Sequence, residues 1–192
     1  MVIPEPKARL EVSLEEGVHA YLSAHFCHDI ASPFRGQDFV VANTARGGER
    51  AGRWTRPDLT LVAIQKFRFP PSIGVELFGF EIKRDMHADI SSVFEAVAHT
   101  RFVHYAYVVW QVLDGSENYK IAKDIETSCL HHGIGLITFS DALVASSYAV
   151  RATPVRQSPH PWDVDEYLTK RLQQPDRDVL LRKVNTMGAA NS

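Results

Sequence analysis

Apolar and polar positions follow different periods in successive segments of the chain. Over residues 13–26, apolar side chains recur every three or four residues, which predicts an amphipathic helix. Ser13 is its predicted N-cap, with Glu16 completing a capping box. Continuous apolar runs then predict three strands, at residues 38–43, 57–67 and 75–84. The prolines between the last two runs predict a turn, since proline cannot continue a sheet ladder.

The second half of the chain alternates helical and strand patterns. The segment that begins at Asp89 starts with the helical period and ends as a β-branched strand at 106–112. A helix at 116–133, ending with Gly133 at its C′ position, and a buried strand at 134–140 follow. The order α-β-β-β-α-β-α-β predicts an α/β fold with a mixed sheet and helices on both faces. We expect one domain at 1–150 and a C-terminal helical appendage with a tail at 151–192, packed on the same domain.

Composition narrows the setting of the protein. The chain has 192 residues, 45% of them hydrophobic and 23% charged, with a net charge of −2. Two cysteines are too few for a disulfide framework, so we expect reduced thiols and a cytoplasmic protein. The N-terminus lacks a signal-peptide pattern, and no apolar run approaches the roughly 18 residues that span a membrane.

Charged residues interrupt the third predicted strand, in the sequence GFEIKRD. Alternate residues of a strand point to one face, so Gly79, Glu81 and Lys83 share a face, while Phe78 and Phe80 share the other. We expect the aromatic face to pack on a helix and Gly79 to leave room for a cavity beside the charges. Buried charges are costly unless they are paired, hydrogen-bonded or bound to a metal.

A third charge comes from the preceding strand, which opens with Asp58. If the two strands form a hairpin, Asp58 lies near Glu81 and Lys83. Two converging carboxylates repel each other unless a cation separates them, and Mg²⁺ (or Mn²⁺) fits two carboxylates, the carbonyl of Ile82 and water. Lys83 would orient or deprotonate an attacking water, or neutralise charge on phosphorus. The set is suited to hydrolysis of a phosphodiester bond.

These residues resemble a known signature. Pro57-Asp58 followed by Glu81-Ile82-Lys83 is similar to the bipartite motif of the PD-(D/E)XK, or restriction-endonuclease-like, nucleases, and the resemblance covers about residues 13–140. It implies a restriction-endonuclease-like fold and a Mg²⁺-dependent nuclease acting on DNA. It also implies Asp58 and Glu81 as metal ligands and Lys83 as the catalytic lysine.

The resemblance also implies two helper positions. Many members add a glutamate from the first helix, and here the choice is Glu15 or Glu16. We prefer Glu15, because it borders the apolar face of that helix. Some members carry a glutamine on the helix after the E-x-K strand; this helix has none, and His99 is the candidate at that place. Two further candidates lie nearby, Arg101 and His104.

The segment that carries the motif is locally basic. Between residues 46 and 84 there are eight lysines and arginines but four acids, two of which are the proposed metal ligands. We predict that nucleic-acid phosphates contact the arginines of the loop, Arg46, Arg50, Arg53 and Arg56. A solvated hairpin tip is the alternative interpretation of that loop.

Structural interpretations of the same residues stay open. Glu81 and Lys83 can form a buried ion pair while Asp58 caps a turn, and Glu15 can complement a helix dipole. The protein can therefore be a catalytically inactive nucleic-acid-binding module of the same fold, or an interaction subunit that docks through its C-terminal helices. By analogy with nucleases that pair two active sites, we also expect a homodimer.

Overall fold

The computed structural model describes residues 6–29, 31–45, 56–69, 72–113, 115, 117 and 119–189. Over these residues the chain forms a six-stranded mixed sheet with five α-helices, which confirms the predicted α/β class. The strands are β1 (Asp38–Asn43), β2 (Leu59–Lys66), β3 (Ile73–Lys83), β4 (Tyr105–Gln111), β5 (Gly135–Phe139) and β6 (Ala149–Ala152). The helices are α1 (Pro6–Ala24), α2 (Ile90–His99), α3 (Tyr119–His132), α4 (Pro161–Arg171) and α5 (Gln174–Ala189).

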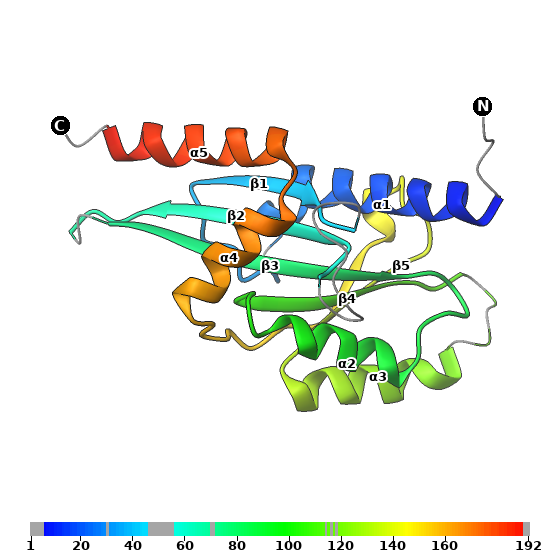
Figure 1. Ribbon diagram of the computed structural model, residues 1–192. Coiled ribbons are helices and arrows are strands. Elements are labelled where there is room, and N and C mark those ends of the chain that lie inside the picture. Colours follow the sequence, from blue (N-terminus) through cyan, green and yellow to red (C-terminus); the bar gives the residue numbers. More distant parts are fainter. Residues whose placement is uncertain are drawn as a thin grey trace.

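The order of strands in the sheet is the order in the chain. Strands β1, β2 and β3 form an antiparallel meander, β3, β4 and β5 run parallel, and β6 returns antiparallel to β5. Each parallel connection contains a helix, α2 or α3 (Figure 1). Because Leu59 pairs with Phe80, the start of β2 and the end of β3 lie at the same end of the sheet.

One face of the sheet packs on α1 and on the 3₁₀ helix that follows it. The apolar face of α1 continues into Phe26, whose ring meets Phe78, Phe80 and Tyr107 edge-on. Such edge-to-face contacts are a favoured arrangement of aromatic rings in a core. The aromatic face predicted for the third strand is therefore correct.

The opposite face is covered by the remaining helices. Helices α2 and α3 lie side by side, α2 over β3 and β4 and α3 over β5 and β6, and in the view of Figure 1 α4 crosses β2 and β3. Trp110 of β4 is completely buried in this core, together with Tyr167 of α4 and Leu180 of α5. The C-terminal helices thus pack on the same sheet as the rest of the chain.

Local signals explain the start of α2 and the end of α3, but not the start of α1. Asp89 caps α2 by accepting hydrogen bonds from the backbone N–H groups of Ser91 and Ser92. Gly133 follows α3 with φ of +67°, as its predicted C′ position requires. The predicted start at Ser13 is wrong, because α1 begins at Pro6. Proline suits a first helical turn, where its missing N–H would be unpaired anyway.

Strand β6 was not predicted. It has four residues at the edge of the sheet and adjoins a proline-rich segment, so its pattern is too short to stand out.

Cys27 and Cys129 are free thiols, as expected. Among the residues described above, no helix has both the length and the apolar character needed to cross a bilayer.

Candidate active site

Asp58 is held in place from three directions at the start of β2. Its N–H donates to the carbonyl of Phe80 at 3.0 Å, and its carbonyl accepts the N–H groups of Thr44 and Ala45, each at 2.9 Å. Its carboxylate atom Oδ2 accepts the N–H of Ile82 at 2.8 Å. The carboxylate of β2 is therefore tied to the motif strand β3.

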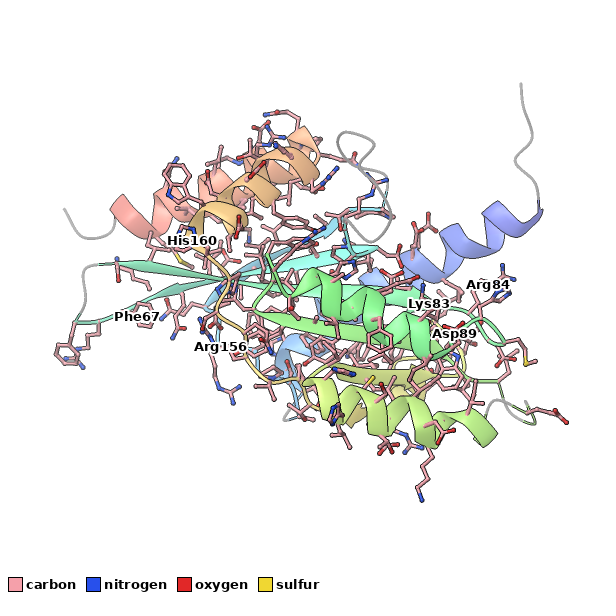
Figure 2. The ribbon with its side chains drawn as sticks, turned by 60° about the horizontal axis from the view of Figure 1, so that its bottom comes forward. Phe67, Lys83, Arg84, Asp89, Arg156 and His160 are labelled. Atoms are coloured by element: carbon pink, nitrogen blue, oxygen red, sulfur yellow. The ribbon has the colours of Figure 1, made fainter. Side chains whose placement is uncertain are left out.

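Glu81 and Lys83 lie at the end of β3, on the face of the sheet that carries α2. The Lys83 Nζ donates to Glu81 Oε1 at 2.9 Å and also to the carboxylate of Glu95 in α2. Figure 2 shows Lys83 with Arg84 and Asp89 beside it, at the end of the sheet opposite Phe67. These contacts gather two carboxylates around one ammonium group.

Sequence reasoning missed Glu95. A signal was present, because Glu95 precedes the predicted helper His99 by four residues in a helix, and such residues share one face. The side chain that contacts Lys83 from α2 is therefore an acid in place of the expected glutamine or histidine.

A pocket of about 250 Å³ opens beside this cluster. It is lined by Leu14, Glu15, Asp58, Ile82, Lys83, Arg84 and His87. The Glu15 carboxylate accepts a hydrogen bond from Asn43 Nδ2 at 2.9 Å, which fixes it at the pocket wall. The structure thus brings Glu15 to the proposed site, whereas Glu16 is exposed on a neighbouring surface.

His99 and the two further candidates that follow its helix lie in different places. His99 is buried, with Nε2 4.0 Å from Glu81 Oε2. Arg101 is exposed beyond the helix. His104 has a structural role, because its Nδ1 accepts the N–H of Leu77 at 3.0 Å. Of the three, His99 is the one placed against the motif.

Burial and crowding change the ionisation of the cluster. Burial raises the pKa of Asp58 to about 6, although the hydrogen bond from Ile82 and the charge of Lys83 oppose it. Burial, and next the charge of Asp58, raise the pKa of Glu81 to about 8. For Lys83, burial favours the neutral form, but Glu81 and Glu95 outweigh it and raise the pKa. The carboxyl groups are thus crowded around one lysine, and Glu81 keeps its proton at pH 7.

His99 ionises in the opposite sense. Burial lowers its pKa to about 4, and the charge of Arg101 adds to that shift. The imidazole is therefore neutral at pH 7 and places no positive charge beside Glu81.

The donor set fits a hard divalent cation. Asp58 and Glu81 offer carboxylate oxygens, and an extended residue points its N–H and C=O to the same side, so the Ile82 carbonyl faces Asp58 as its N–H does. Within the described part of the chain, no three His, Cys, Asp or Glu side chains form a metal-binding group. Mg²⁺ often takes only one or two carboxylates and keeps several waters.

The arginine loop is described only at its end. Arg46, Arg50 and Arg53 lie outside the described residues, so their predicted phosphate contacts stay a prediction. Arg56 is half-buried, and its charge acts on the phenol of Tyr167 in α4.

Comparison with known proteins finds no relative of this chain. No family model, no curated protein and no solved structure matches it.

The expected space beside Gly79 does not exist. A Cβ atom at Gly79 would lie 3.2 Å from Pro57 Cγ and 3.3 Å from a Val103 methyl group. The glycine therefore lets Pro57, the residue before Asp58, pack directly on β3. The cavity lies instead at the end of the strand, beside Lys83.

Replacing Gly79 with alanine should consequently lower the free energy of unfolding by about 1–2 kcal/mol, the usual cost of overpacking a core. Urea denaturation would measure it. Gly188→Ala in α5 is the matched control, because its new Cβ meets only Ile73 Cδ1 at 3.8 Å and alanine favours a helix. A Gly79→Ala protein as stable as the wild type would contradict this account of the Pro57 contact.

Proposed function

We propose that this chain is a metal-dependent nuclease of restriction-endonuclease-like fold that hydrolyses phosphodiester bonds in DNA. The observation that carries the proposal is that Asp58 and Lys83, from adjacent strands, line one pocket, where Glu81 is hydrogen-bonded to Lys83. Raised pKa values of both carboxylates support it, because strongly perturbed groups gather at functional sites.

The arrangement of elements also supports the family. A helix, a three-stranded antiparallel meander, a second helix and a parallel strand follow each other in the order expected for this fold. The PD turn opens the second strand, and the E-x-K sequence closes the third. The place of both halves of the motif on adjacent strands supports the proposal.

The residues have separate roles in the proposed reaction. Asp58, Glu81 and the carbonyl of Ile82 would hold Mg²⁺ or Mn²⁺, with Glu15 across the pocket as a further oxygen donor. A cation held there polarises a phosphoryl oxygen and lowers the pKa of bound water. Lys83, with its raised pKa, keeps its proton at pH 7. We therefore assign it to neutralising charge that develops on phosphorus rather than to accepting a proton.

Substrate phosphates would reach this acidic cluster only with positive groups nearby. Arg84 lines the same pocket as Lys83 and Asp58. Arginine suits this place, because its planar guanidinium can donate two hydrogen bonds to one phosphate. The loop arginines predicted from sequence would extend the contact along the nucleic-acid backbone.

A cleavage assay tests the proposal. Purified protein is incubated with supercoiled plasmid, linear duplex, single-stranded DNA and RNA, in Mg²⁺, Mn²⁺ or EDTA. We expect cleavage of DNA with either metal, none in EDTA, and a loss of at least about 100-fold in Asp58→Asn, because a metal ligand is replaced by a neutral amide.

Asp38→Asn is the matched control, since Asp38 also opens a strand but pairs with Lys183 outside the pocket. It should cleave like the wild type. If no nucleic acid is cut in any metal, the nuclease proposal fails. Binding of DNA that is unchanged by Asp58→Asn would then favour the inactive nucleic-acid-binding module.

A further inference from the structure

A series of buried hydroxyl groups connects helix α4 with the turn at Pro57–Asp58. The hydroxyl of Tyr167 lies 2.6 Å from Thr60 Oγ1, which lies 3.1 Å from Thr44 Oγ1. Thr44 Oγ1 donates to the carbonyl of Pro57 at 2.8 Å. Pro57 is the residue before Asp58, so this series of hydrogen bonds ends one residue from a proposed metal ligand.

The direction of these hydrogen bonds follows from their proton count. A threonine hydroxyl has a single proton, and Thr44 uses its proton on the carbonyl of Pro57. Thr60 must therefore donate to Thr44, and Tyr167 must donate to Thr60. Hydrogen bonds that run in one direction in a buried site polarise and strengthen each other.

We propose that Tyr167 is a positioning residue, which holds the Pro57–Asp58 turn in place from helix α4. Thr44, at the other end of the hydroxyl chain, also donates its N–H to the carbonyl of Asp58 at 2.9 Å. Any looseness of Thr44 therefore moves the backbone of Asp58 directly. We call the hydrogen bonds from Tyr167 through Thr60 and Thr44 to Pro57 the hydroxyl brace. Its importance for catalysis rests on the proposed nuclease function, whereas its effect on the position of Asp58 does not.

Tyr167 also supports the other half of the motif. Its ring stacks on Phe102, with the centroids 4.3 Å apart and the planes at 8°. Phe102 packs against His99, which lies beside Glu81. One side chain outside the signature thus contacts the supports of both proposed carboxylate ligands. Helix α4 is in this sense part of the site and not only a cover of the sheet.

A merely structural tyrosine would stabilise the whole domain without acting on Asp58 in particular. The N–H of Ile82 separates the two cases, because it donates to Asp58 Oδ2 at 2.8 Å and so reports where that carboxylate is. The N–H groups of Thr44 and Ala45 report the Asp58 carbonyl in the same way.

The test is amide hydrogen exchange by NMR on metal-free Tyr167→Phe, which keeps the stacked ring and loses only the hydroxyl. We expect the amides of Ile82, Thr44 and Ala45 to exchange about tenfold faster, the factor that one lost hydrogen bond typically contributes. The amide of His104, which donates to the carbonyl of Leu77 at 2.9 Å, should be unchanged.

Tyr148→Phe is the matched control. Its hydroxyl donates to the Ala142 carbonyl at 3.0 Å, far along the chain from the PD turn, so exchange at Ile82 should stay at the wild-type rate. Thr44→Val removes the last link to Pro57 and should reproduce the pattern of Tyr167→Phe. In the cleavage assay, Tyr167→Phe should lower kcat about tenfold while KM for DNA stays the same.

Exchange that is unchanged at Ile82, or that rises equally at every amide, would overturn the proposal. Neither result depends on metal or DNA, so a failure of the brace is distinct from a failure of the nuclease function. If cleavage is absent but Ile82 exchange responds selectively, the nuclease proposal fails and the brace stands.

Discussion

Replacing Lys83 with methionine should lower the rate of DNA cleavage by about 100- to 1000-fold, the cost of removing one preorganised charge from a transition state. Methionine has nearly the length of lysine and fills the same space without the ammonium group. The variant then lacks the ammonium group that would offset charge on phosphorus, and Glu81 and Glu95 lose the group that both contact. Single-turnover cleavage at saturating Mg²⁺ measures the rate of the chemical step.

The control for this variant is Lys183→Met. Lys183 is also half-buried and paired with an acid, Asp38, which is the residue replaced in the control variant of the cleavage assay. We expect it to cleave at the wild-type rate. Near-ultraviolet circular dichroism should show that Lys83→Met keeps its tertiary packing. Equal rates for wild type and a folded Lys83→Met protein would remove Lys83 from the mechanism.

Replacing Glu81 with glutamine should make the metal-free protein more stable at pH 8, by about 2–3 kcal/mol or roughly 5 °C in Tm. Burial and the charge of Asp58 raise the pKa of Glu81 to about 8, so its ionisation is unfavourable in the folded state. Glutamine has nearly the same shape and never ionises. Thermal unfolding in EDTA from pH 5 to pH 9 measures the effect.

The sign of the pH dependence follows from proton linkage. Between pH 4.5, the ordinary pKa of a glutamate, and about pH 8, folded Glu81 keeps a proton that the unfolded chain releases. Stability of the wild type therefore falls as pH rises through this window. Asp58 acts in the same sense and His99 in the opposite sense, but both remain in the variant. The difference between variant and wild type should thus be small at pH 5 and largest at pH 8 and above.

Glu76→Gln controls for the change of side chain. Glu76 is on the same strand but pairs with Arg156, away from the motif. It should give no pH-dependent gain in Tm. Mg²⁺ should then stabilise the wild type more than Glu81→Gln, because a ligand stabilises only the fold that binds it. A Glu81→Gln protein less stable than the wild type at pH 8 would show that Glu81 has a structural role instead.

Most elements of the sheet were predictable because each carries its own signal. Strand β1 has the predicted bounds, 38–43, and β2 lies within the predicted run. Most of their side chains are apolar, and valine and isoleucine are among them, which suits a pleated, buried surface. The start of α1 was not predictable from its cap, because a capping signal at Ser13 lies inside a longer helix. Strand β6 exists by pairing with β5, a contact that its own four residues do not encode.

Some residues of the proposed site were likewise predictable from the sequence, and others were not. Asp58, Glu81 and Lys83 were recognisable because alternation in a strand decides which side chains share a face. Glu95, Asn43 and Tyr167 have no such local mark, and their roles come from contacts with residues distant in sequence. The sequence likewise suggested a space beside Gly79, where the packing of Pro57 leaves none.

By itself, the sequence determined the periods of the helices and strands, the order of the first eight elements and the alternation that separates the charged face of β3 from its aromatic face. These are local properties, set by backbone geometry over a few residues. Only the tertiary structure decided that Glu95 contacts Lys83, that Asn43 holds Glu15 at the pocket and that α4 reaches the PD turn. Those contacts depend on how whole elements pack, and packing is selected by the fit of many side chains together rather than by any one of them.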